Sequence, residues 1–313
     1  MFAWAAALLL ATAAGAKPRE VVVGAYLNDI QNLDLKTHSY EADLYLWFRW
    51  RDSKHDPAAN VEFNNPNELW GHARTSAYEK PERLPDGSYY QVLRAQGRFS
   101  RKLSLEQYPF DRQVLAIEFE DPKLESEDLV FVADSPALAV NPDLKLPGFK
   151  LGEAKLTIHE YVYPSSFGDP RRKARTRYSR VSVTQAIERP TLAYAVKLIL
   201  PVLCVIFCAS LLFLFHPRYV DARAGIGITA LLTIVALQIT LNEDLPEVDY
   251  LILMDKIYIG AYFFVIGALA MVVRTTKLFD AGKEARALKL DRLALGGMLA
   301  AFIAGTAALF FWR

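Results

Sequence analysis

The side chains that most often carry out chemistry are scattered along this chain rather than grouped. The sequence has no metal-ligand spacing, no phosphate-binding glycine loop and no pairing of a nucleophile with a base. The histidines stand singly, at His38, His55, His72, His159 and His216. These patterns predict that the protein is not an enzyme and holds no metal and no cofactor. A membrane-anchored hydrolase is therefore the weakest interpretation.

Polar residues inside an apolar segment indicate a different kind of chemistry. Residues 224–241 are long enough to cross a bilayer, yet they include Thr229, Thr233, Gln238 and Thr240. Polar side chains in a membrane helix either face a polar path or bond the carbonyls of their own helix. The residues alone leave both interpretations open.

Composition changes sharply along the chain, which predicts two domains. From Val21 to about Ile187 charges recur every few residues, whereas long apolar runs follow Leu192. We expect a soluble domain over residues 17–190 and a membrane domain over 191–313. Its four helices are expected near 192–215, 224–242, 250–273 and 291–312, each able to span a hydrocarbon core of roughly 30 Å.

The charges between the apolar segments predict the orientation of the chain. Basic residues occupy the first and third connections, as Arg218, Arg223, Arg274, Lys277, Lys283, Arg286, Lys289 and Arg292, whereas residues 242–249 contain acids and no base. Basic connections stay in the cytoplasm, so the N-terminal domain is expected outside. Residues 1–16 fit a cleaved signal peptide, with a fifth spanning helix as the alternative. The net charge of +1 gives no reason to expect a nucleic-acid partner.

The soluble half has the pattern of an antiparallel β-sandwich of the immunoglobulin-like kind. Short runs rich in β-branched and aromatic residues recur at Val21–Leu27, Asp43–Trp50, Tyr89–Phe99, Val114–Phe119, Leu129–Val132, Ala154–Val162 and Tyr178–Ile187. Pro85-Asp86-Gly87-Ser88 is typical of a hairpin turn. Both cysteines, Cys204 and Cys208, lie in the membrane half, so the exported domain has no disulfide of its own.

Several motifs on this topology resemble those of the pentameric ligand-gated ion channels, or Cys-loop receptors. Tyr108-Pro109-Phe110-Asp111-Arg112-Gln113 resembles their signature loop. The other matches are Trp50-Arg51-Asp52 in the second strand, Glu188-Arg189-Pro190 before the first helix, Pro201 within it, and Leu245-Pro246 after the second helix.

The resemblance also implies a branch of the family and a set of partners. Cysteines flank the signature loop in animal members, but Arg101 and Leu115 stand at those positions here, which fits the prokaryotic branch. The implied protein is a homopentamer in the lipid bilayer of a bacterial inner membrane, with its receptor domain in the periplasm. A small-molecule agonist or protons would open it to monovalent cations.

The family's register places one stripe of the second helix on the pore, with spacings of four residues or three. The stripe is Asp221, Gly225, Thr229, Leu232, Ala236, Ile239 and Glu243. Leu232 and Ile239 would form apolar constrictions, and Asp221 and Glu243 would form acidic rings that favour cations. Asp221 is alternatively a simple N-cap of this helix. Arg223 nearby is a base that the family carries in cation and anion channels alike, turned away from the pore.

The resemblance also implies a receptor site between subunits. A hairpin offers Tyr161, Tyr163, Phe167 and Tyr178 on one face of the site, and Tyr45 falls on the complementary face. Aromatic faces attract amines, although these side chains could equally pack on their own strands. The same hairpin carries Arg171, Arg172, Lys173, Arg175 and Arg177, which leaves anionic ligands or a response to pH open.

A last group is implied where the two domains meet. Asp111 and Arg189 are expected to approach each other, with Pro246 beside them and Asp34 joining from the first hairpin. Their role would be to pass a rearrangement of the receptor domain to the pore helix. The competing interpretation is a membrane-anchored periplasmic binding or sensor protein that conducts no ions. A polar stripe in the second helix favours the channel, because an anchor needs none.

Overall fold

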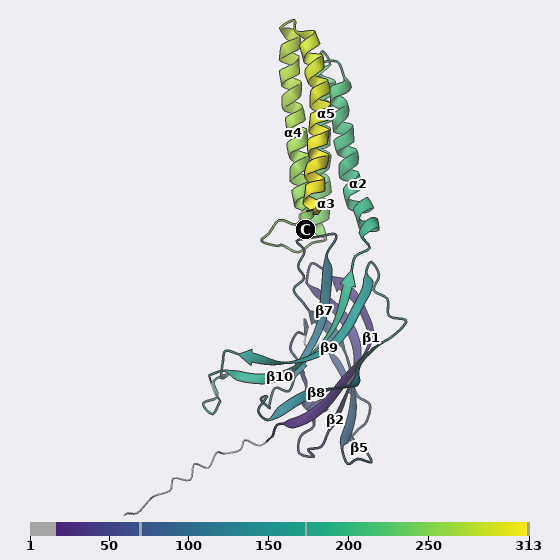
Figure 1. The fold of residues 1–313 in the computed structure, drawn as a ribbon, viewed down its shortest axis with the longest axis vertical. Helices are drawn as coiled ribbons and strands as arrows, with labels where there is room; N and C mark the ends of the chain where they lie inside the picture. Colours follow the sequence, from purple (N-terminus) through teal and green to yellow (C-terminus); the bar gives the residue numbers. More distant parts are fainter. Residues whose placement is uncertain (1–16, 69–70, 173, 312–313) are drawn as a thin grey trace, which may run out of the picture.

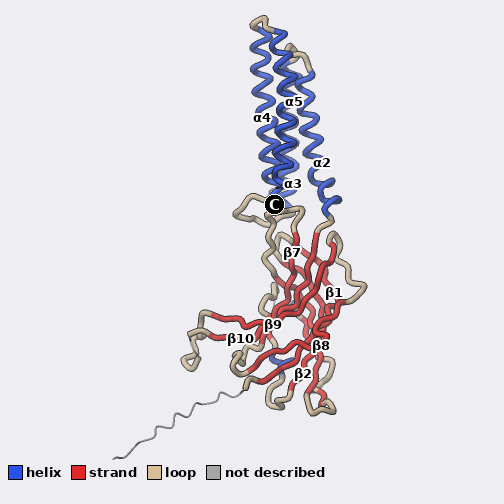
Figure 2. Tube along the Cα trace, in the orientation of Figure 1, coloured by secondary structure: helices blue, strands red, loops and turns tan. Residues whose placement is uncertain are grey.

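The computed structural model describes residues 17–68, 71–172 and 174–311 as a sandwich of strands followed by a bundle of long helices (Figures 1 and 2). The predicted fold class is therefore confirmed. The expected signal peptide at residues 1–16 lies outside the described residues. The C-terminal end of the last helix returns to the junction between the two parts (Figure 1).

The sandwich consists of two sheets. The first has the strand order β4-β6-β2-β1-β8, with β5 also paired to β6, and the second has the order β3-β7-β10-β9. The strands are β1 (Arg19–Asp34), β2 (Ser39–Trp50), β3 (Glu62–Phe63), β4 (Ala73–Ser76), β5 (Glu82–Arg83), β6 (Tyr89–Ser100), β7 (Arg112–Glu120), β8 (Leu129–Val140), β9 (Lys150–Tyr163) and β10 (Thr176–Glu188); a short helix, α1 (Pro57–Asn60), follows β2.

One pair departs from the expected antiparallel arrangement, because β1 and β8 run parallel, with Val21 opposite Phe131. The chain leaves β7 in the second sheet and crosses to the edge of the first, so no tight hairpin sets the direction of β8. The predicted turn at residues 85–88 does form a hairpin between β5 and β6. Gly87 adopts a φ of +83° there, a conformation that glycine reaches without steric cost.

The core lies between the two sheets and follows from the two-residue period of the strands. In β2, alternate residues such as Leu44, Leu46 and Phe48 are fully buried. The Phe48 ring meets Phe119 of the second sheet edge-on, with 6.3 Å between ring centroids. Truncating such a ring to alanine typically costs about 3–5 kcal/mol.

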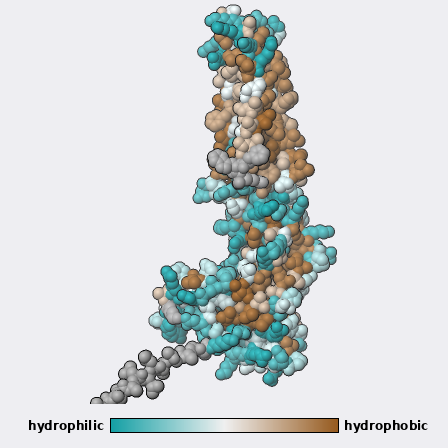
Figure 3. Space-filling model, viewed as in Figure 1, coloured by the Kyte–Doolittle hydropathy of each residue, from teal (hydrophilic) through white to brown (hydrophobic). Residues whose placement is uncertain are grey.

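Four helices follow the sandwich, and among the described residues they are the ones long and apolar enough to cross a membrane. They are α2 (Thr191–Ser210), extended by the 3₁₀ helix η2 (Leu211–Leu214), α3 (Val220–Glu243), α4 (Leu253–Asp280) and α5 (Glu284–Phe311). Apolar side chains cover their surface, and hydrophilic side chains gather at the end away from the sandwich (Figure 3).

The helices extend beyond the apolar segments that predicted them. Residues 274–280 continue α4 and residues 284–290 begin α5, so most bases expected in a loop lie on helix ends. The short turn between them is made by Gly282, whose φ is +73° and whose N–H donates to Phe279 O. Arg223, expected in the first connection, lies within α3, because that helix begins at Val220.

Candidate functional site

One face of α3 packs into the bundle, and the predicted stripe occupies the opposite face. The buried residues are Arg223, Gly227, Ala230, Ile234 and Leu241. Every residue of the stripe is exposed in the single chain: Asp221, Gly225, Thr229, Leu232, Ala236, Ile239 and Glu243. Leu232 is 65% exposed, whereas its neighbour Leu231 packs against the bundle core. The stripe thus lies on the exposed side of α3, which also includes Ile228 and Val235, and is available to other chains or to a central axis.

The sequence left open whether the polar residues of α3 face a polar path or bond the carbonyls of their own helix. Thr233 donates to Thr229 O at 2.8 Å and Thr240 donates to Ala236 O at 3.1 Å, so both hydroxyls bond their own helix. Gln238 lies off the stripe and accepts a hydrogen bond from Tyr262 of α4 at 2.5 Å. Thr229 is the stripe's one hydroxyl residue.

Asp221 stands in the first turn of α3 but is not its N-cap. Tyr219 occupies the cap position with φ −90° and ψ 58°, and its side chain makes no capping hydrogen bond. The alternative reading of Asp221 as an N-cap is therefore wrong, because the helix begins at Val220, two residues earlier than an N-cap at Asp221 would require. A carboxylate in the first turn still interacts favourably with the helix dipole.

The predicted aromatic residues of the β9–β10 hairpin come together where this hairpin projects from the sandwich (Figure 1). The Tyr163 ring meets Tyr161, Phe167 and Tyr178, with centroid distances of 4.8, 5.2 and 5.7 Å. Tyr45 lies on β2 in the other sheet, beside Tyr26. Within one chain it does not join this cluster.

A residue that the sequence interpretation missed, Arg180, fills the cluster. Its guanidinium carbon lies 3.6 Å from the Tyr161 ring centroid, and its nitrogens donate to Glu120 at 2.9 and 2.8 Å. It also donates to the Tyr163 hydroxyl at 2.5 Å. Burial and the neighbouring Glu120 raise the pKa of Tyr163 to about 12. The two-residue period of β10 places Arg180 on the face of Tyr178, which is the signal that could have revealed it.

The basic residues at the tip of this hairpin are partly neutralised. Arg171 donates to both carboxylate oxygens of Asp169, at 2.9 and 2.8 Å, and these bonds lower the pKa of Asp169 to about 2. Arg172 donates to the Tyr178 hydroxyl. Lys173 lies outside the described residues.

Asp111 and Arg189 meet at the junction, as the sequence led us to expect. Arg189 Nε donates to Asp111 Oδ1 at 2.8 Å, and both side chains are almost fully buried. Three rings surround the guanidinium at 4.6–5.2 Å, those of Tyr108, Phe149 and Tyr194. Burial also raises the pKa of Tyr108. A buried pair of this kind strongly resists loss of one partner.

The signature loop also contacts the connection between α3 and α4, through residues that the sequence did not single out. Leu105 N donates to the Tyr250 hydroxyl at 2.9 Å, and Leu253 N donates to Glu106 O at 2.9 Å. Pro246 lines a cavity of about 460 Å³ together with Leu105 and Tyr250.

The signature loop reaches the last helix as well. The Phe110 ring meets Phe310 of α5 edge-on at 5.3 Å. The loop therefore contacts the connection that follows α3 and the end of α5.

Asp34 lies apart from the Asp111–Arg189 pair. It accepts hydrogen bonds from Lys36 N and the Thr37 hydroxyl, both at 2.8 Å, and so closes the turn between β1 and β2. The bonds from Thr37 and Lys36 outweigh the effect of burial and lower its pKa. Leu35 of the same turn packs against the core of the helices. This turn thus reaches the junction through an apolar contact rather than through Asp34.

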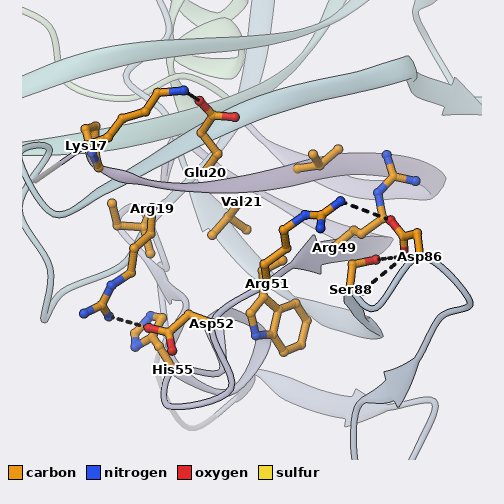
Figure 4. A pocket seen from close by; sticks show the side chains of 14 residues that line it. Lys17, Arg19, Glu20, Val21, Arg49, Arg51, Asp52, His55, Asp86 and Ser88 are labelled. Atoms are coloured by element: carbon orange, nitrogen blue, oxygen red, sulfur yellow. Dashed lines mark hydrogen bonds and ion pairs between the residues drawn. The ribbon is translucent and has the colours of Figure 1, made fainter.

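Another hollow lies at the other end of the sandwich, where β1 begins and β2 ends (Figure 4). It has a volume of about 670 Å³. Its charges pair with one another, Arg19 with Asp52 at 3.0 Å and Arg51 with Asp86 at 3.7 Å. Among the described residues, no group of histidine, cysteine and carboxylate side chains is placed to hold a metal ion.

Comparison with known proteins draws on both halves of the chain. No family model matches it. A proton-gated ion channel of Gloeobacter violaceus is 24% identical over 290 residues, which cover 88% of this chain and 78% of that protein. The beta-4 subunit of the chicken (Gallus gallus) gamma-aminobutyric acid receptor is 23% identical over 275 residues, covering 82% of this chain and 54% of the relative.

A third relative, a serotonin-gated chloride channel of Caenorhabditis elegans, is 22% identical over 271 residues, covering 80% of this chain and 53% of the relative. These matches coincide with a sandwich followed by four membrane-length helices. Over most of its length the chain is similar to members of the pentameric ligand-gated ion channel superfamily. It is a multi-pass membrane protein with an extracellular domain. The chain spans about half the length of the animal members of this superfamily that it matches.

The first testable prediction concerns the junction between the two domains. Arg189→Gln leaves Asp111 buried without its counter-charge, so we expect a loss of roughly 3–5 kcal/mol in stability. Adding Asp111→Asn should recover most of that loss, because the unpaired charge is then removed. Thermal unfolding of the detergent-solubilised protein measures both effects.

The matched control for this prediction is Arg112→Gln. Arg112 adjoins Asp111, but its ion pair with Glu188 is exposed, with 3.2 Å between Nε and Oε1. We expect this variant to change stability by less than about 1 kcal/mol. Equal losses in the Arg189 and Arg112 variants would show that the buried pair does not hold the junction.

Proposed function

We propose that the chain is one subunit of a homopentameric ion channel, gated by a small-molecule ligand or by pH and lined by α3. The observation that carries the proposal is the stripe on α3. It is exposed, its residues are spaced by four or three, and it lies opposite the face that packs into the bundle. Around a shared axis, one such stripe from each subunit would form a continuous lining.

Charge at both ends of the stripe supports selectivity for monovalent cations. Asp221 at one end and Glu243 at the other are exposed, and rings of carboxylates lower the barrier for cations. The base beside Asp221 does not counter this ring, since Arg223 is buried on the opposite face of α3. The choice between cations and anions does not follow from the relatives, because one of them is a chloride channel.

The proposed setting is a bacterial inner membrane with the sandwich in the periplasm. The end of the bundle away from the sandwich carries the bases of the α4–α5 turn, as cytoplasmic ends do. The acidic connection after α3 lies against the sandwich. Arg101 and Leu115 replace the cysteines that flank the signature loop in animal members, which supports the bacterial branch.

The receptor cluster bears on the class of ligand. One face of the Tyr161 ring is already covered by Arg180, whose guanidinium carbon lies 3.6 Å from the ring centroid. An amine agonist on that face would have to displace a guanidinium that is also bound to Glu120. This arrangement weakens the case for a simple amine and favours the two alternatives that the basic hairpin left open, an anionic ligand or a response to pH.

A specific observation supports protons as a stimulus. His38 lies in the turn between β1 and β2, and its Nδ1 accepts a hydrogen bond from Leu103 N at 3.2 Å. Burial lowers the pKa of His38, Lys102 lowers it further, and Asp34 opposes them. Protonation of Nδ1 would remove this acceptor and so loosen the turn from the segment that leads into the signature loop.

The second prediction tests the proposed function directly. The membrane-extracted protein should have a mass near five times 35.2 kDa, slightly less if residues 1–16 are cleaved. Reconstituted in planar bilayers under a potassium chloride gradient and screened with ligands and pH steps, it should give currents that reverse near the potassium potential. A stable monomer that binds ligand, or a pentamer silent under every stimulus, would favour the sensor without conduction.

The third prediction concerns the constriction. Leu232→Thr should widen and wet the apolar ring, so we expect leak currents or activation at lower stimulus. Leu231→Thr is the matched control, since Leu231 lies about 100° around the helix and packs against the bundle core. A larger effect on gating from Leu231→Thr than from Leu232→Thr would show that the register of α3 is wrong.

The fourth prediction concerns pH. Because the pKa of His38 is lowered in the folded protein, the unfolded chain binds more protons, and His38 contributes stability above its unfolded pKa of about 6.5. That contribution is lost as the pH falls through the folded pKa. His38→Asn keeps an acceptor near Nδ1, tolerates the φ of +52° at this position and does not titrate. Its melting temperature should therefore fall less than that of the wild type between pH 7 and pH 5.

The control for the pH prediction is His159→Asn, at an exposed position on β9. This variant should follow the wild-type pH profile. If His38→Asn follows it as well, His38 does not couple the junction to pH.

A further inference from the structure

Arg223 is held inside the helix bundle by contacts from three other elements. Its side chain is fully buried. Nε donates to Leu212 O at 3.0 Å, and Nη1 donates to the Thr275 hydroxyl at 3.1 Å. Nη2 donates to Asp291 Oδ1 at 2.6 Å. The guanidinium thus joins η2, α4 and α5 to the first turn of α3.

Asp291 is the one charge that compensates this guanidinium among the contacts of the described residues. It lies on α5 and is 1% exposed, and its Oδ2 has no hydrogen-bond partner among those residues. A charge in a low-dielectric interior is tolerated when it is paired with an opposite charge. Removing either partner leaves the other as an uncompensated buried charge, which strongly destabilises the fold. Without Asp291, the favourable place for the guanidinium would be in water.

Arg223 lies in the first turn of α3, at the end of the helix that carries Asp221. Arg223 follows Asp221 by two residues, which places the two side chains about 200° apart around the helix. The two side chains point to opposite faces, but both belong to the first turn of α3, so a guanidinium that left the bundle would reach water at the same end of the helix as the Asp221 carboxylate. In a pentamer, five such cations would offset five carboxylates at the inner mouth.

We propose that Asp291 is a positioning residue for ion selectivity: by holding Arg223 inside each helix bundle, it leaves Asp221 as the charge at the inner mouth. This inference rests on the proposed function. Asp291 contacts no permeating ion and acts from the last helix through Arg223. A purely structural role, in which the pair only fastens α5 to α3, would lower the stability of the pentamer without changing which ions pass.

The test measures the reversal potential of the full-length channel in planar bilayers under a potassium chloride gradient. Asp291→Asn keeps the shape of the side chain and removes its charge. We expect the permeability ratio of potassium to chloride to fall at least threefold. Adding Arg223→Gln should restore the wild-type ratio, because the released cation is then absent. A purely structural pair would not show this rescue of selectivity.

The matched control is Glu284→Gln. Glu284 also lies on α5 and carries the same charge, but it pairs with exposed His216 at 2.9 Å rather than with Arg223. We expect its reversal potential to equal that of the wild type. If the reversal potential shifts equally in this variant, the loss of any negative charge at the cytoplasmic end is enough to explain the effect. That result would overturn the role of Asp291.

Mixed pentamers keep the test decisive if Asp291→Asn alone does not assemble. Wild-type and tagged variant subunits are co-expressed, and channels with one variant subunit should already show a smaller potassium-to-chloride ratio. Channels that contain the variant yet reverse at the wild-type potential would overturn the inference. A wild-type protein that is silent or passes chloride would instead overturn the proposed function, before any substitution is made.

Discussion

A guanidinium removed from water needs a carboxylate at hydrogen-bond distance, and this requirement governs how the parts of the chain are joined. The nearly buried pairs are Arg180 with Glu120, Arg189 with Asp111, and Arg223 with Asp291. In each pair the partners are at least 60 residues apart in sequence. Each pair therefore fixes one joint: β7 to β10, the sandwich to the start of α2, and α3 to α5.

The rotation of α3 about its own axis follows from the same kind of constraint. Lipid is as apolar as a leucine side chain, so apolar residues alone do not decide which face of a membrane helix meets its neighbours. Three contacts do decide it here. Arg223 must reach Asp291, and Gln238 accepts a hydrogen bond from the Tyr262 hydroxyl. Gly227 allows the Leu269 side chain to come so close that a Cβ at position 227 would lie 2.5 Å from Leu269 Cδ2. The proposed pore stripe is the face that these contacts leave free.

Local patterns in the sequence predicted the strands and the four spans, because their causes are local. The alternation that includes Leu44, Leu46 and Phe48 is typical of a strand, and the same residues are the buried ones in the structure. The parallel direction of β8 and the inward position of Arg223 depend on partners far along the chain, Asp291 being 68 residues away. The pairing of Asp111 with Arg189 was accessible only through the family resemblance. The ion pair that covers Tyr161 could have been anticipated only by following the period of β10 as far as Arg180.

The two domains meet through contacts of unequal strength, and this inequality bears on the proposed gating. The buried Arg189–Asp111 pair makes the start of α2 move with the sandwich. The α3–α4 connection contacts the sandwich through neutral groups, by apolar packing of Leu245 and Ile252 in one cluster with Leu105. Two neutral hydrogen bonds add to this packing, from Leu105 N to the Tyr250 hydroxyl and from Leu253 N to Glu106 O, each worth about 1 kcal/mol. Ligands typically shift such equilibria by about 1–3 kcal/mol, enough to exchange these bonds but not to separate the ion pair. Because this connection follows directly from Glu243, its displacement would move the outer end of the stripe while α2 stays attached to the sandwich.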